Sequence, residues 1–107
     1  MTLKLTLKRK WFDMIASGEK KEEYREIKPY WKSRLTYQKG NCLSHSHLWE
    51  FKEYDTIQFI NGYSKNAPSI LVECKGITVG VARPEWSDNW QGGVFIIKLG
   101  EIIEIKK

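Results

Sequence analysis

Residues 18–25 read Gly-Glu-Lys-Lys-Glu-Glu-Tyr-Arg, a Gly-x-Lys-x-x-Glu-x-Arg arrangement that directly follows a segment of helical spacing. The segment from Lys20 to Ile27 has no glycine or proline, and successive residues of an extended chain point to opposite faces. As a strand, this segment would place Lys21, Glu23 and Arg25 on one face. Its glutamate and lysine content also allows a helix by propensity. We expect the strand and keep the helix as the alternative.

The residues before this arrangement predict a strand followed by a short helix. Residues 2–8 alternate leucine with threonine or lysine, the period-two pattern of a strand with one buried face. From Lys10 onward the apolar residues recur at a spacing of three and four, through Trp11, Phe12, Met14 and Ile15. Gly18 offers a helix C-cap, so the helix should end at Ser17 or Gly18.

The residues that follow the arrangement predict a second helix and then an irregular segment. Pro29 suits the first turn of a short helix that carries Trp31 and Leu35. Residues 36–53 mix glycine, asparagine, serine and two histidines with little periodicity. We expect an irregular insertion or a poorly ordered loop there.

The rest of the chain is typical of β-structure. Residues 55–60 alternate apolar and polar side chains, and Asn61-Gly62 supplies a turn that tolerates positive φ. A loop rich in tryptophan and glycine follows Pro84. The other expected strands are 69–75 and 77–82, separated by Gly76, and 94–99 and 102–105, separated by Gly100.

These elements predict an α+β fold with five to seven short strands and one or two short helices near the N-terminus. Short strands leave exposed edges unless the sheet closes, so we expect a small, curled, partly closed β-barrel. A chain of 107 residues suits one hydrophobic core. Residues 1–107 should therefore form a single domain, with the irregular insertion at about 36–53.

Composition predicts a folded protein of the cytoplasm. The chain is 41% hydrophobic and 29% charged, close to globular averages. Its apolar runs are too short to span a bilayer, and it opens on alternating leucine and lysine without an apolar signal segment. Cys42 and Cys74 are too few for a disulfide framework, so both should be reduced, with Cys74 in the core.

The positive charge of the chain is concentrated in its first third. Residues 1–40 carry 11 Lys or Arg against 5 Asp or Glu, a net charge of +6, whereas residues 41–107 carry 7 against 8, a net charge of −1. Concentrated positive charge attracts phosphates, whereas evenly spread charge mainly aids solubility. The asymmetry favours a polyanionic partner.

The Gly-x-Lys-x-x-Glu-x-Arg arrangement resembles the signature of the ASCH domain family. The strand and helix before it and the β-rich segments after it also follow that family's order, so the resemblance covers most of the chain. It implies a PUA-like barrel that binds RNA, with the motif lining a cleft between the barrel and the helical segment. Without the resemblance, the same residues would be solvated strand charges that form a weak surface ion pair.

The motif also suits a nucleotide-like ligand by its chemistry. Lys20 offers a mobile point charge, Arg25 a planar fork for phosphate or a base edge, and Glu23 an acceptor that restrains Arg25 or receives a base amino group. A polar loop at 61–66 adds amide, hydroxyl and ammonium donors. The expected ligand-binding residues are Gly18, Lys20, Lys21, Glu23, Tyr24, Arg25, Asn61, Tyr63 and Lys65.

An enzyme is the first alternative. One branch similar to the family hydrolyses the acyl group of N4-acetylcytidine, with a lysine at the position of Lys20 and a threonine where this chain has Glu23. Lysine is a nucleophile or base only when it is neutral, which burial or neighbouring cations favour and Glu23 opposes. Glu23 would act as a general base if an apolar wall raised its pKa. Lys20 and Glu23 are the catalytic candidates.

A protein-interaction module is the second alternative. Tyr24, Tyr63, Trp86 and Trp90 lie in the motif or in polar loops, where an aromatic ring stacks on a base or simply packs. The loop around Trp86 and Trp90 would dock a protein partner if it formed an exposed apolar patch. The sequence leaves the oligomeric state open.

We expect no metal and no cofactor. Cys42-x-x-His45-x-His47 offers fewer than the four ligands of a structural zinc site, and the other cysteine falls in an expected strand. The chain has no phosphate loop, dinucleotide fingerprint or nucleophile elbow.

Overall fold

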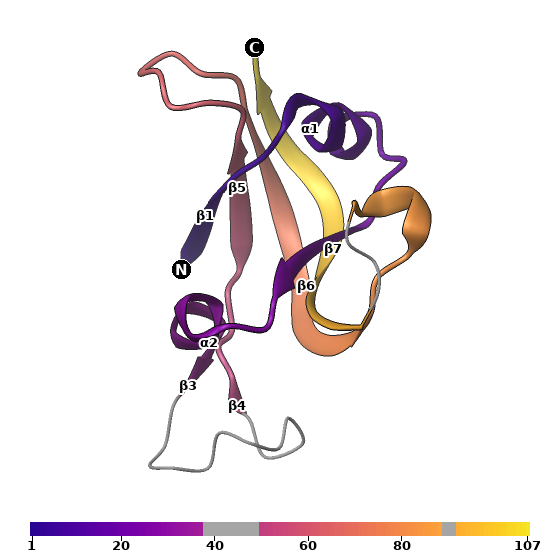
Figure 1. Ribbon diagram of the computed structural model, residues 1–107. Coiled ribbons are helices and arrows are strands. Elements are labelled where there is room, and N and C mark those ends of the chain that lie inside the picture. Colours follow the sequence, from indigo (N-terminus) through magenta and orange to yellow (C-terminus); the bar gives the residue numbers. More distant parts are fainter. Residues whose placement is uncertain (38–49, 89–91) are drawn as a thin grey trace.

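The computed structural model describes residues 1–37, 50–88 and 92–107, and in these ranges it shows a five-stranded sheet with two α-helices (Figure 1). The strand order is β1-β5-β6-β7-β2, and a separate small sheet pairs β3 with β4. The elements are β1 Thr2–Thr6, α1 Arg9–Ala16, β2 Glu22–Glu26, α2 Pro29–Leu35, β3 Thr36–Tyr37, β4 Glu50–Phe51, β5 Thr56–Ile60, β6 Ser69–Val81, the 3-10 turn Pro84–Trp86 and β7 Gly93–Lys106.

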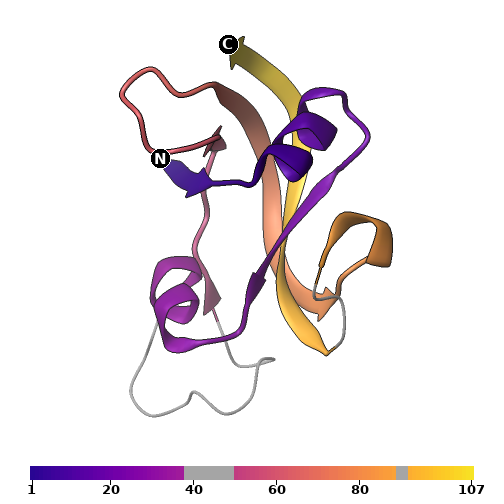
Figure 2. The same cartoon turned by 45° about the horizontal axis from the view of Figure 1, so that its top comes forward.

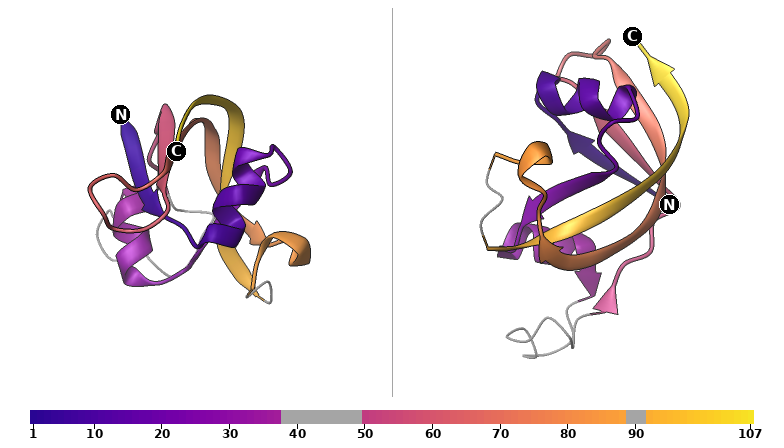
Figure 3. Two further views of the ribbon diagram at one scale, coloured as in Figure 1. Left: turned by 90° about the horizontal axis from the view of Figure 1, so that it is seen from above. Right: turned by 90° about the vertical axis from the view of Figure 1, so that its right-hand side faces the viewer.

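The sheet is mixed and curls into a half-barrel, with β1 and β2 as its two edge strands (Figure 3). β1 runs parallel to β5, whereas all other neighbours are antiparallel. The edge strands lie at opposite ends of the strand order, yet the Arg25 guanidinium of β2 donates a hydrogen bond to the Thr6 carbonyl of β1 at 3.2 Å. An α+β fold with a partly closed barrel is therefore confirmed.

The predicted break at Gly76 is wrong, because β6 continues through it as one strand of 13 residues. The pairing of β6 with β7 changes register between Cys74 and Gly76, and Gly76 has a φ of +130°. A β-bulge accommodates an extra residue and bends the strand without ending it. Gly100 lies inside β7 in the same way, so the two expected C-terminal strands are also one. The bulges bend β6 and β7 and so contribute to the curl of the sheet.

The main core lies between α1 and the inner face of the sheet. β7 places Phe95, Ile97 and Leu99 on this face and Val94 and Ile96 on the other. The helix α1 contributes Trp11, Phe12 and Ile15 to the core, as its spacing predicts. Figures 1 and 2 show α1 and α2 toward opposite ends of the half-barrel.

The ends of several elements match the sequence closely. The first strand is two residues shorter than expected, and α1 ends at Ala16, with Ser17 as its C-cap and Gly18 at a φ of +85°. α2 begins at Pro29 as predicted. No helix among the described residues is long and apolar enough to cross a membrane.

The predicted insertion at 36–53 is ordered at both ends. Thr36 and Tyr37 pair antiparallel with Phe51 and Glu50. The Lys52 amide also donates to the Leu35 carbonyl at 2.9 Å, so backbone pairing supplies the order that side-chain periodicity does not reveal. Residues 38–49, which include Cys42, His45 and His47, lie outside the described residues.

Candidate functional site

The strand β2 carries the central part of the motif and turns two of its charges inward. Glu23 pairs with Ile97 and Arg25 with Phe95, so both lie on the face that β7 uses for the core. Tyr24 lies on the opposite face and packs against the smaller apolar cluster. The expected strand is confirmed over Glu22–Glu26, and the helix alternative is wrong.

Lys20 is the most buried charged residue of the motif, with 1% of its surface exposed. Its Nζ donates to the carbonyl oxygens of Glu22 at 2.6 Å and Trp86 at 2.9 Å. The same atom lies 5.2 Å from the Trp11 ring centroid and 4.8 Å from that of Tyr24. Two carbonyls and two aromatic faces thus replace the water that Lys20 loses. By bonding to both carbonyls, Lys20 connects the Pro84–Trp86 turn to the start of β2.

Glu23 joins Lys20 to Arg25. Its Oε1 lies 3.2 Å from Lys20 Nζ, its Oε2 lies 2.8 Å from Arg25 Nη2, and its side chain is 8% exposed. We call these three residues the ion chain. The alternative for these residues, solvated strand charges that form a weak surface ion pair, is wrong, because Lys20 and Glu23 are buried.

Arg25 is the member of the ion chain that reaches the surface, with 17% of its side chain exposed. Its guanidinium is held by Glu23 and by the Thr6 carbonyl, and its Cζ lies 4.8 Å from the Trp31 ring centroid. Its Nε is buried and has no hydrogen-bond partner among the described residues. Arg25 is therefore fixed in place, with one buried donor left unpaired in the described part of the chain.

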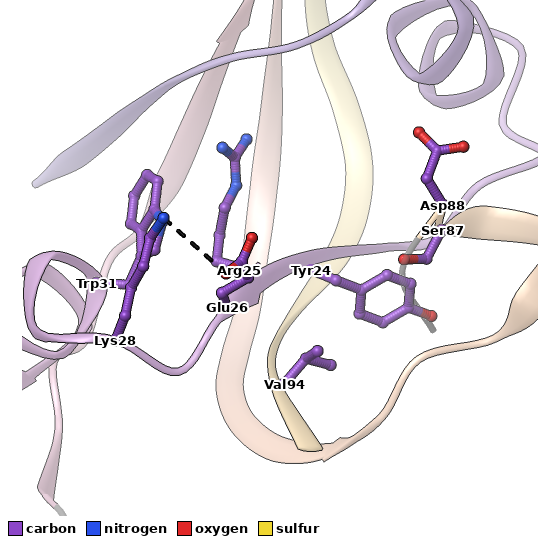
Figure 4. Close-up of a pocket in the computed structure, with 8 residues that line it drawn as sticks. All are labelled: Tyr24, Arg25, Glu26, Lys28, Trp31, Ser87, Asp88 and Val94. Atoms are coloured by element: carbon purple, nitrogen blue, oxygen red, sulfur yellow. Dashed lines mark ion pairs between the residues drawn. The ribbon is translucent and has the colours of Figure 1, made fainter. Parts of the chain in front are cut away.

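Arg25 and Trp31 line two adjacent pockets. The first pocket has a volume of about 390 Å³, and Figure 4 shows the side chains around it. Its charges balance in number, since Arg25 and Lys28 are basic and Glu26 and Asp88 are acidic, and Lys28 Nζ lies 4.0 Å from a carboxylate oxygen of Glu26. Its other side chains are Tyr24, Trp31, Ser87 and Val94. The first pocket thus combines two aromatic rings with both donors and acceptors.

The second pocket, of about 590 Å³, lies on the other side of Arg25 and Trp31. Its charged lining residues are all basic among those described: Lys4, Lys8, Arg25 and Arg34. Asn61 and Tyr63 also line this pocket, and Tyr63 is 93% exposed. The Asn61 side-chain amide donates to the Leu7 carbonyl at 3.0 Å, which fixes its orientation. This pocket attracts anions by Coulomb forces.

Burial shifts the acid–base behaviour of two residues in the motif. Burial lowers the pKa of Lys20 below that of an ordinary lysine, although the Glu23 carboxylate opposes this shift. Burial raises the pKa of Tyr24, and the hydrogen bond from its hydroxyl to Glu22 at 2.6 Å adds to this effect. Tyr24 is therefore a neutral donor at physiological pH.

The structure brings only some of the expected ligand-binding residues together. Arg25, Asn61 and Tyr63 line the second pocket, and Tyr24 joins Arg25 at the first. Lys20 and Glu23 are buried and line neither pocket, and Glu23 forms ion pairs with both Lys20 and Arg25. Lys21 precedes β2 and is exposed, unlike Glu23, with which it was expected to share a face. Gly18 follows Ser17, the C-cap of α1, and lines neither pocket. Lys65 is exposed and lines neither pocket.

Several site residues were not among those expected from the sequence. Trp31 was expected only as part of a helix. It lies six positions after Arg25, and the sequence gives no sign that the two side chains are in contact. Lys4, Lys8 and Arg34 come from three separate segments, and the basic first third of the chain was their only signal. Trp86 is half-buried, and Trp90 lies outside the described residues. In the described part of the chain, no group of three or more His, Cys, Asp or Glu is placed to hold a metal.

Comparison with protein-family models, curated proteins and solved structures finds no match to this chain. The ASCH resemblance therefore stays a hypothesis that depends on the motif and its position between α1 and the β-rich remainder. Function is therefore inferred from the chemistry of the two pockets.

Proposed function

We propose that this protein is an RNA- or nucleotide-binding module whose ligand contacts Arg25 and Trp31, and that its half-barrel is a PUA-like domain of the ASCH kind. The observation that carries the binding function is the preset Arg25 guanidinium, stacked on Trp31 at the wall between two pockets. A guanidinium held by a carboxylate and a carbonyl loses little freedom when it binds. Position and chemistry thus favour a planar, anionic ligand.

The first pocket supports the choice of a nucleobase. Tyr24 and Trp31 offer aromatic surface, and bases of any sequence stack on such rings. Glu26 and Asp88 offer carboxylates that accept from base amino groups, and Arg25 and Lys28 offer donors. Because these charges balance, the pocket suits a polar but uncharged ring better than a free anion.

Changing Arg25 to lysine is expected to weaken nucleotide binding by about 1.5–3 kcal/mol, the range for a hydrogen bond to a charged group. Lysine keeps the charge but loses the planar fork and its stacking on Trp31. Fluorescence anisotropy with labelled single-stranded RNA measures the effect. Arg9→Lys is the matched control, because Arg9 is exposed on α1 and lines neither pocket. Equal affinity of the two variants, or no RNA or nucleotide binding by the wild type, would refute the proposal.

The lowered pKa of Lys20 supports a second candidate, an amidohydrolase that acts on an acylated nucleoside such as N4-acetylcytidine. A buried lysine is more readily neutral and hence nucleophilic. Its Nζ, however, is engaged by the Glu22 and Trp86 carbonyls and by Glu23. Catalysis would require these contacts to open, so this candidate ranks second.

The second candidate predicts that N4-acetylcytidine is converted to cytidine, at a rate that rises with pH as Lys20 loses its proton. Because burial lowers the pKa of Lys20, the rise should occur at lower pH than for an ordinary lysine. Chromatography of the products measures the rate. Lys20→Arg, which stays protonated, should be inactive, and absence of turnover by the folded wild type would dismiss this substrate.

A further inference from the structure

We infer that the second pocket is a backbone subsite: it binds the phosphodiesters of a single-stranded nucleic acid whose base occupies the first pocket. This inference rests on the proposed function and adds the class and extent of the ligand. Its basis is the division of charge between two pockets that share Arg25 and Trp31. One pocket has balanced charge and the other is basic throughout its described lining.

The shared wall suits the covalent structure of a nucleotide. A base and its own phosphate are joined through one ribose, so their binding sites must be neighbours. Arg25 is positioned to contact both the base and its phosphate, because it lines both pockets. The ion pair between Lys8 and Asp88, at 3.3 Å, is a second connection between the pockets.

The basic side chains of the second pocket outnumber the charges of one phosphodiester. Lys4 and Arg34 have no carboxylate partner in the described part of the chain, and Arg34 is 4.9 Å from the Tyr30 ring centroid. Lys8 is paired with Asp88 and Arg25 with Glu23, but both cations also line the second pocket. Four cations suit successive phosphates along a strand, and the exposed ring of Tyr63 can stack on a neighbouring base.

The ligand should be single-stranded because of the first pocket. A base must leave its stack and its pairing partner before it can enter the first pocket and stack on Tyr24 or Trp31, which costs a few kcal/mol in a duplex. An unpaired strand avoids this cost. The two pockets together therefore favour a flexible strand over a double helix.

The test compares labelled RNA from a mononucleotide to an oligomer of about six nucleotides, across a salt series. Affinity should increase with length, and the oligomer should bind more tightly than the same sequence in a duplex. The variant Lys4→Gln with Arg34→Gln should reduce the slope of log K against log salt by about 1.4, because each lost contact with a single strand contributes about 0.7. Cytidine and adenosine, which have no phosphate, should bind the variant and the wild type equally.

Lys98→Gln with Lys107→Gln is the matched control, since it removes the same charge from exposed positions on β7 and at the C-terminus that line neither pocket. An unchanged salt slope in the Lys4/Arg34 variant, while Arg25→Lys still weakens binding, would overturn the backbone subsite and leave the proposed function intact. Tight binding of duplex RNA, or equal competition by polyglutamate of matched charge, would also overturn it. Absence of any RNA or nucleotide binding would refute both.

Discussion

Glu23→Gln is expected to destabilise the protein by about 3–5 kcal/mol, the range for removing one partner of a buried ion pair. The carboxylate of Glu23 lies 3.2 Å from Lys20 and 2.8 Å from Arg25, and Lys20 has almost no contact with solvent. Glutamine keeps the shape but leaves the buried cation without its counter-charge. A loss of this size is a large part of the 5–15 kcal/mol that stabilises a typical domain.

Urea unfolding, followed by tryptophan fluorescence, measures the change. Glu26→Gln is the matched control: Glu26 is exposed on the same strand, lies 4.0 Å from Lys28, and should change stability by less than about 0.5 kcal/mol. The double variant Lys20→Met with Glu23→Gln should be less destabilised than Glu23→Gln alone, because it also removes the uncompensated charge. Similar stabilities for the two single glutamine variants would show that the ion chain contributes little.

The parts of the fold that follow from local pattern could be predicted from the sequence. Alternating leucines predict β1, three- and four-residue spacing predicts α1, and Pro29 marks the start of α2. The strand breaks at Gly76 and Gly100 were wrong because glycine permits a bulge as readily as it ends a strand, and only pairing with a partner strand decides between them.

The burial of the motif could not be predicted, because it depends on distant partners. Charged residues are rarely buried unless they are paired. The partners of Lys20 include the Trp86 carbonyl, which lies 66 residues away in the sequence. Arg25 likewise depends on the Thr6 carbonyl, across the opening between the two edge strands. Sequence spacing identified the three charges of the motif but not which of them faces a ligand.

The basic lining of the second pocket could not be predicted from the sequence for the same reason. Its cations come from β1, β2, α2 and the residues between β1 and α1, and the curl of the sheet brings these segments together. The excess of positive charge in residues 1–40 indicated a polyanionic partner without indicating a location. Three of its four basic residues therefore appeared only with the fold.

Trp31→Leu is expected to cause the largest loss of ligand affinity, because Trp31 is an aromatic wall of both pockets and the surface on which Arg25 stacks. Stacking of one base is worth about 1–3 kcal/mol, and loss of the Arg25 contact adds to this. Leucine retains apolar contact with the core, against which Trp31 packs. Both nucleoside and oligonucleotide binding should fall, unlike the salt-dependent loss expected for the Lys4/Arg34 variant.

The control is Trp86→Leu, since Trp86 is also half-buried and stacks with an arginine, Arg83, at 4.9 Å, but lines neither pocket. Isothermal titration with a short RNA and with a nucleoside measures both variants. Combining Trp31→Leu with Arg25→Lys should cost less than the sum of the single changes, because each removes the same stacked pair. If Trp86→Leu weakened RNA binding more than Trp31→Leu, the ligand would lie at the Pro84–Trp86 turn. Strict additivity would show that Arg25 acts independently of Trp31.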